Sequence, residues 1–251
     1  MPLDDINIRL DGLGHLIADK AISVPTFQRA YAWEEKHVRS LFQDIGAAIR
    51  TSQKEYFLGS IVAAPSALGT EVVDGQQRLA TAAILLAAIR DYFTSKGDTD
   101  RAKQIETTYL ITKDFRTQEP VPRLRLNSLD RDFFVQNVLL HPKERKPTEP
   151  ERNSHKRIAR AAELAAEHVR NLAATTNTAT EVLADWLDFV THRARVIWVE
   201  VPDHANAFTI FETLNDRGLD LAISDLLKNF LFNLAGDRIN EAQAMWTEMI
   251  G

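Results

Sequence analysis

The sequence predicts an α+β fold in which a small mixed sheet forms an N-terminal core and a mainly helical region follows. Short β-rich runs and helical stretches alternate over the first 95 residues, and helical patterns dominate the rest. With 251 residues, of which 45% are apolar and 26% charged, the chain can bury one large core or two modest ones. We place the boundary near residue 95, between regions 1–95 and 96–251.

Five elements are predicted in the core. A short run entering a proline predicts a strand at Ala21 to Pro25. Apolar residues spaced by three and four then predict an amphipathic helix. Tyr56 to Ala63 and Glu71 to Val73 predict neighbouring strands, and Gln76 to Phe93, apolar nearly all round, predicts a buried helix. The amphipathic stripe consists of Val38, Leu41, Phe42, Ile45 and Ile49.

Beyond residue 95 the predicted elements are mostly helices. Strand patterns occur at Arg123 to Leu126 and at Arg195 to Val201, and the second could join the N-terminal sheet. His141 to Asn153 contains three prolines among charged residues, which predicts an exposed loop. Helices are predicted at Asp130 to Leu140, Ser154 to Ala174, Ala179 to His192, Asn206 to Leu214, Ser224 to Leu234 and Arg238 to Ile250.

Composition excludes several classes of protein. Because the chain has no cysteine, disulfides, thiolate metal sites and thiol nucleophiles are excluded. The longest apolar run, Leu79 to Ile89, is too short to span a bilayer, and Asp4 and Asp5 stand where a secretory signal needs basic residues. We therefore expect a cytoplasmic protein with no membrane partner. The net charge of −5 means that any nucleic acid must be held by a local basic patch.

The strongest motif is Val-Val-Asp-Gly-Gln-Gln-Arg at residues 72–78, where a strand turns into the buried helix. The unpaired N–H groups and the dipole at such a helix start can form an anion site. Gly75 allows close approach, and Arg78 could hold phosphate oxygens. Gln76 and Gln77 could donate to them or orient a water, while Asp74 could bind Mg²⁺. The alternative is an ordinary capped turn without a ligand.

A second cluster is the segment Pro25 to Trp33, which we call the aromatic loop. Its aromatic side chains alternate with an amide and a guanidinium, which suits stacking on bases and binding of phosphate. Such a loop could hold a nucleotide or an extruded DNA base. The alternative for Tyr31 and Trp33 is packing beneath the loop. The candidate residues are Phe27, Gln28, Tyr31 and Trp33 for DNA, and Gln28 and Arg29 for nucleotide.

A third cluster is formed by the loop that joins the predicted helices Asn206 to Leu214 and Ser224 to Leu234, together with the start of the second helix. A polar loop there can point Asn215, Arg217 and Lys228 into a shared cleft as nucleotide-binding residues. The alternative is a plain helix-loop-helix corner that ends on Gly218.

Taken in order, these clusters resemble the N-terminal domain of the GmrSD family of modification-dependent restriction proteins, whose relatives include SspE and BrxU. The resemblance extends from about Val24 to Phe232. Phe27 stands where tyrosine is common in the family, and Ala80 precedes Thr81 where a threonine pair is common. The matching segments are VPTFQRAYAW, YFLGSIV, VVDGQQRLAT and IFETLNDRGLDLAISDLLKNFLF.

The resemblance implies a ParB/sulfiredoxin-like core that binds and hydrolyses a nucleoside triphosphate with Mg²⁺. It implies a sensor of modified double-stranded DNA, carrying a glucosylated base or a phosphorothioate backbone, and an HNH nuclease domain or subunit beyond residue 251. A homodimer is a further expectation. By this resemblance Asp74, Gln76, Gln77 and Arg78 are catalytic, Gly75 binds nucleotide, and Asp74 binds the metal.

Two other functions remain open from the sequence. A non-catalytic DNA-binding module could use bound nucleotide only as a conformational clamp, and phosphate release would separate it from a nucleoside triphosphatase. Direct nicking of DNA by the core would require a metal-dependent centre.

Overall fold

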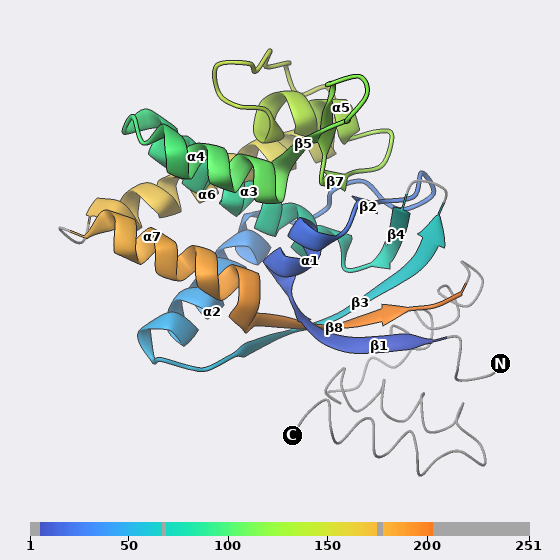
Figure 1. The fold of residues 1–251 in the computed structure, drawn as a ribbon, viewed down its shortest axis with the longest axis horizontal. Coiled ribbons are helices and arrows are strands. Elements are labelled where there is room, and N and C mark those ends of the chain that lie inside the picture. The colour runs from blue at the N-terminus through green and yellow to red at the C-terminus, as the bar shows by residue number, and fades with distance from the viewer. Residues whose placement is uncertain (1–5, 67–68, 175–177, 203–251) are drawn as a thin grey trace, which may run out of the picture.

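The computed structural model describes residues 6–66, 69–174 and 178–202, and it confirms the α+β class. One six-stranded mixed sheet has the order β1-β8-β3-β4-β2-β7, and a separate hairpin pairs β5 with β6. Figure 1 shows the labelled helices gathered to one side of the larger sheet. The strands are β1 (Asn7–Gly12), β2 (Ile22–Ser23), β3 (Tyr56–Ser66), β4 (Gly69–Asp74), β5 (Ile111–Lys113), β6 (Pro120–Pro122), β7 (Leu124–Arg125) and β8 (Ala194–Glu200).

The sheet is assembled from segments far apart in the sequence. β8 lies between β1, to which it is antiparallel, and β3, to which it is parallel. β2 runs parallel to both β4 and β7. The sheet therefore contains strands from both of the regions that meet near residue 95, and the predicted strand at 195–201 joins it as β8, between the edge strand β1 and β3.

The amphipathic and the buried helix predicted in the core are both present. Helices are α1 (Leu13–Asp19), α2 (Glu35–Arg50), α3 (Gln76–Ser95), α4 (Thr99–Ile105), α5 (Arg131–Phe134), α6 (Asn153–Ala174) and α7 (Ala179–Asp188). Single π-helical turns extend α4, α5 and α7, at Glu106–Leu110, Val135–Leu139 and Phe189–Arg193. The patterns did not predict β1, α1, α4, β5 or β6, which are all short.

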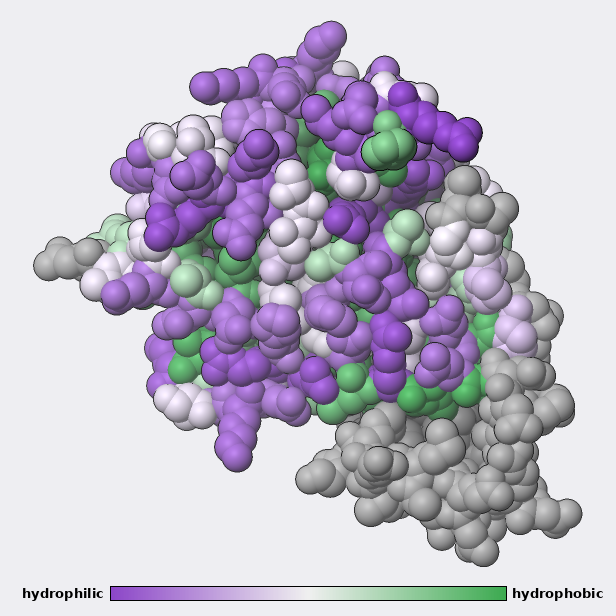
Figure 2. Space-filling view, viewed as in Figure 1, coloured by the Kyte–Doolittle hydropathy of each residue, from purple (hydrophilic) through white to green (hydrophobic). Residues whose placement is uncertain are grey.

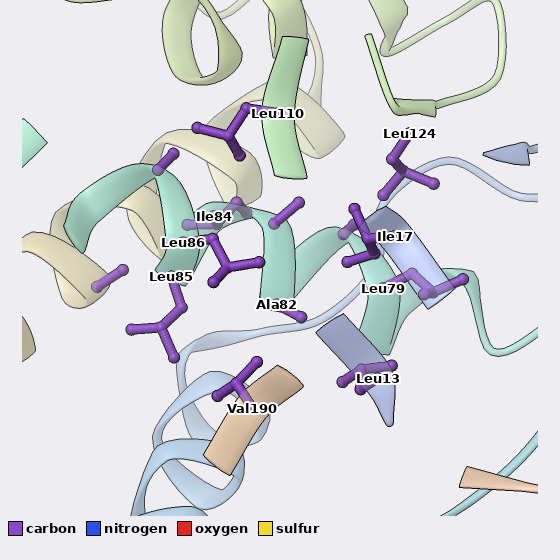
Figure 3. Close-up of a cluster of buried hydrophobic side chains, with 14 of the residues drawn as sticks. Leu13, Ile17, Leu79, Ala82, Ile84, Leu85, Leu86, Leu110, Leu124 and Val190 are labelled. Carbon is purple, nitrogen blue, oxygen red and sulfur yellow. The ribbon is translucent and has the colours of Figure 1, made fainter. Parts of the chain in front are cut away.

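Helix α3 is the centre of the hydrophobic core. Most of its side chains are buried, because α1, α4 and α6 pack around it. Figure 3 shows Leu79, Ala82 and Leu86 of this helix among side chains from other elements, including Leu13 and Val190. The start of α3 is thereby held in a fixed position relative to the sheet.

Arg90 connects α3 to the helical region that follows. Its side chain is 0% exposed, and its guanidinium donates to the backbone oxygens of residues 138–140 at 2.9 to 3.1 Å. It also pairs with Asp91 and Glu106, each at 2.6 Å. Because these contacts satisfy the buried charge, α3 and the turn ending at Leu139 form one rigid unit.

The predicted helices at 206–214, 224–234 and 238–250 lie outside the described residues. Across 6–66, 69–174 and 178–202, no helix is long and apolar enough to cross a bilayer. The face drawn in Figure 2 is mainly hydrophilic.

The packing of α2, α6 and α7 predicts a dependence of stability on pH. The ring of His168 stacks on Phe42 and meets the edge of Trp186, with centroid distances of 5.0 and 4.6 Å. Burial lowers the pKa of His168, so the folded chain keeps it neutral where the unfolded chain takes up a proton. The free energy of unfolding should therefore fall as pH drops below about 6.5.

We expect His168→Phe to weaken this pH dependence, measured by urea unfolding between pH 7.5 and 5.5. An identical pH dependence in variant and wild type would show that His168 does not contribute to it.

Candidate functional site

The turn between β4 and α3 has the geometry of an anion site. Gly75 has φ +94°, a left-handed conformation that strains other residues. A Cβ on Gly75 would lie 2.6 Å from Cγ1 of Ile61, so the backbone approaches β3 closely. Asp74 ends β4, and its carboxylate accepts a hydrogen bond from the N–H of Gly75. The buried helix therefore begins directly beside the sheet, with its positive end at the turn.

Arg78 is held by an irregularity in β3. The register between β3 and β8 shifts between Phe57 and Ser60, and Gly59 has φ +99° within this bulge. Nη1 of Arg78 donates to the carbonyl oxygen of Ser60 at 2.7 Å. A Cβ on Gly59 would lie 3.2 Å from Nη2 of Arg78, so the absence of a side chain gives the guanidinium its space.

Asp74 is an acid held between cations in a half-buried position. Burial raises the pKa of Asp74, and the charges of Arg78 and Arg29 oppose that rise. Burial likewise lowers the pKa of Arg78, which Asp74 opposes. Two guanidinium groups from separate segments thus act electrostatically on one carboxylate at the start of α3, a cluster of perturbed groups typical of functional sites.

Buried side chains of α3 hold the C-terminal half of the aromatic loop. Oε1 of Gln77 accepts the N–H groups of Ala32 and Trp33 at 2.8 and 3.3 Å, and its Nε2 lies 3.4 Å from the carbonyl oxygen of Ala30. The motif predicted that Gln77 contacts phosphate or water. In the structure its amide binds the loop backbone, so Gln77 positions the loop.

The hydroxyl of Tyr31 adds a further bond between loop and helix. Thr81 Oγ1 donates to the carbonyl oxygen of Gln77 at 2.8 Å, and the Tyr31 hydroxyl lies 2.8 Å from the same Oγ1. Because Thr81 has a single proton to donate, Tyr31 is the donor in this second bond. Burial raises the pKa of Tyr31 well above its usual range.

The segment after β7 holds the other half of the loop. Nδ2 of Asn127 donates to the carbonyl oxygen of Gln28 at 2.9 Å, and Oδ2 of Asp130 accepts the N–H of Tyr31 at 2.7 Å. Both side chains are 1% exposed. No local sequence pattern indicated the roles of Asn127, Asp130, Gly59 and Ser60, because these roles come from long-range contacts.

The side chains of the aromatic loop fall into two groups. Phe27 is 66% exposed, Arg29 is also exposed, and the Oε1 of Gln28 accepts from Nε2 of Gln76 at 3.4 Å. Tyr31 is 3% exposed, which corrects its assignment to DNA: its ring packs in the core, as the packing alternative proposed. Trp33 is half-buried against the core, with its ring stacked 6.0 Å from that of His37.

Within the described part of the chain, no group of three or more His, Asp or Glu side chains is placed to hold a metal ion. Asp74, the expected metal ligand, is accompanied instead by two guanidinium groups. A single carboxylate can still take part in Mg²⁺ binding when substrate phosphates supply the other ligands. Asn215, Arg217 and Lys228 lie outside the described residues, so their predicted proximity to this site stays a prediction.

A family model described as the GmrSD restriction endonuclease, N-terminal domain, matches residues 13–232. The chain belongs to this family. It is therefore a restriction-system protein of a family that acts on DNA, and the predicted resemblance is confirmed. The match includes the β4–α3 turn, the aromatic loop and the segment after β7. No curated protein matches the chain.

The bonds of Gln77 predict its effect on stability. Gln77→Leu keeps the side-chain size but leaves the N–H groups of Ala32 and Trp33 without their acceptor. We expect the free energy of unfolding to fall by about 1–3 kcal/mol, measured by chemical denaturation. Gln76→Leu is the matched control, because the one side-chain bond found for Gln76 is long, and it should cost less. Equal losses would contradict a loop-holding role specific to Gln77.

Asp74 should destabilise the fold at neutral pH. Because its pKa is raised above the ordinary 3.8, the folded chain favours the uncharged acid, and stability is lost as pH rises through the folded pKa. Asp74→Asn, which keeps an acceptor for Gly75, should therefore unfold at a higher temperature than wild type at pH 7. The difference should shrink below pH 4. A variant less stable than wild type at pH 7 would show that the two arginines outweigh burial.

Proposed function

We propose that this chain is the nucleoside-triphosphate-binding and hydrolysing sensor of a restriction system that recognises modified double-stranded DNA. The observation that carries the proposal is that Arg29 lines a pocket with Gln76 and Gln77 at the start of a buried helix, and that Arg29 and Arg78 both act electrostatically on Asp74, in a chain of this family. A helix start with left-handed Gly75 presents N–H groups to an anion, and the arginines supply charge.

We assign separate tasks to Arg29 and to the residues of the motif. Arg29 is exposed and would contact the β- and γ-phosphates, whereas Arg78 donates to the carbonyl oxygen of Ser60 and would balance the charge of Asp74. Gln76 lies at the first position of α3 beside Gln28. Mg²⁺ bound with the triphosphate would neutralise charge that develops during phosphoryl transfer, with Asp74 as its protein ligand.

DNA contact is proposed through the outer part of the aromatic loop. Phe27 offers an exposed ring for stacking on a base, and Arg29 lies two residues away. Trp33 lines a surface pocket whose other wall includes basic side chains of α6. Arg157 and Arg160 in that wall pair with Glu34 and Glu35 at the start of α2, at 3.7 and 2.9 Å, so phosphate would have to compete for them. A nuclease domain or subunit, and a second copy of the chain, are the other proposed partners.

A nucleotide-gated DNA-binding module without hydrolysis is the alternative. The hydrogen bonds between the aromatic loop and Gln77 of α3 favour this alternative. Through them, a nucleotide bound at the helix start would directly shift the conformational equilibrium of the loop that carries Phe27. Release of inorganic phosphate distinguishes the two functions.

The central test is Arg29→Ala. Loss of a charge-assisted phosphate bond should weaken binding of a non-hydrolysable triphosphate by about 10- to 100-fold, measured by calorimetry with Mg²⁺. Arg39→Ala is the matched control, because Arg39 is an exposed arginine of α2 that pairs with Glu35. Equal affinity in Arg29→Ala and wild type would remove Arg29 from the site. Absence of binding to wild type would overturn the proposed function.

A further inference from the structure

Asp130 is a buried residue, and one of its two carboxylate oxygens has no hydrogen-bond partner within the described part of the chain. It lies just before α5, and its Oδ2 is occupied by the N–H of Tyr31. Its Oδ1 is buried and has no hydrogen-bond partner among the described residues. His155 Nε2 is 3.9 Å away, but that nitrogen donates to the carbonyl oxygen of Leu129 at 2.9 Å. A buried charged oxygen without a donor is costly, and such groups are often functional.

This carboxylate lines a small pocket against the first turn of α3. Arg29 is the other charged residue of the lining, and the pocket has room for about one water molecule. Gln76 and Gln77 form its α3 side, so it adjoins the helix start where phosphate is proposed to bind. Asn127 also lines it, but both polar atoms of that side chain are used within the chain. The remaining wall is formed by Val24, Tyr31, Ala80 and Leu126.

We propose that this pocket holds the water that attacks the γ-phosphate, and that Asp130 is its general base. The inference rests on the proposed hydrolysis of triphosphate. The water oxygen bonds to the γ-phosphorus while its proton passes to Oδ1 of Asp130. The bond between the γ-phosphorus and the β,γ-bridging oxygen breaks, and its electron pair leaves with the nucleoside diphosphate. Inorganic phosphate is the second product, and Asp130 then returns its proton to solvent.

The two carboxylate oxygens of Asp130 have different roles in this proposal. Its Oδ2 accepts the N–H of Tyr31 in the loop that carries Arg29, and its Oδ1 has no hydrogen-bond partner among the described residues. General base catalysis needs an acceptor within hydrogen-bond reach of the water, and a carboxylate meets this need once its other contacts hold it in place. No glutamine of the motif can accept a proton in this way, because amides are not bases at neutral pH.

Asp130→Asn tests the inference in the full chain. Asparagine has the same shape and still offers an acceptor to the N–H of Tyr31, so thermal stability should change little. Phosphate release from Mg·ATP and Mg·GTP should fall by about 10²- to 10³-fold in kcat, with KM nearly unchanged. Asp132→Asn is the matched control, because Asp132 is exposed on the same helix, and it should hydrolyse as wild type does.

Each other outcome overturns the inference in a distinct way. If Asp130→Asn releases phosphate at the wild-type rate, Asp130 is not the base, and the proposed triphosphatase function still stands. A fall in kcat that comes with an equal loss of triphosphate binding and of thermal stability would give Asp130 a purely structural role. If wild type releases no phosphate from either triphosphate, the proposed hydrolysis and the inference fail together.

Discussion

The hydrogen bonds between the aromatic loop and buried side chains are the interaction on which the rest of the site depends. Gln77 and Asp130, from segments more than 50 residues apart, each accept backbone N–H groups of the same loop. Each bond contributes only about 1 kcal/mol, but leaving a buried N–H or carboxylate unpaired costs more. The loop therefore has one low-energy position, and Arg29 is carried to the start of α3 by backbone contacts that do not involve its own side chain.

Several residues near the aromatic loop and the start of α3 have an unfavourable environment or backbone conformation. Asp74 is a partly buried acid, Arg78 a partly buried cation, and two glycines adopt left-handed conformations where a Cβ would meet Ile61 or Arg78. Such features persist only when the surrounding packing fixes them, and the packing of α3 on every side does this. Arg90, with its guanidinium fully paired, keeps the far end of the same helix in place.

Sequence patterns predicted the elements that carry a long periodic signal. The stripe of α2 and the continuous apolar character of α3 both follow from local spacing, and the motif predicted the strand that turns directly into a helix at Gly75. Strands were predicted at 21–25 and 123–126, where the structure has the two-residue β2 and β7, whereas the mixed pattern of β1 gave no strand signal. Within the site, a glutamine that holds a loop has the same local sequence as one that faces phosphate. Gln77 and Asp130 could be assigned only once the pairing of β2 with β7 had brought the loop beside the segment after residue 125.

The central claim is that phosphate groups bind where α3 begins, against a loop that is already in place. A crystal structure with Mg²⁺ and a non-hydrolysable triphosphate tests it most directly. The account predicts phosphate oxygens within hydrogen-bond distance of the N–H groups of Gln76 or Gln77 and of the Arg29 guanidinium, with Tyr31 still buried. Phosphates bound elsewhere, or a loop that has left Gln77 to admit them, would contradict it.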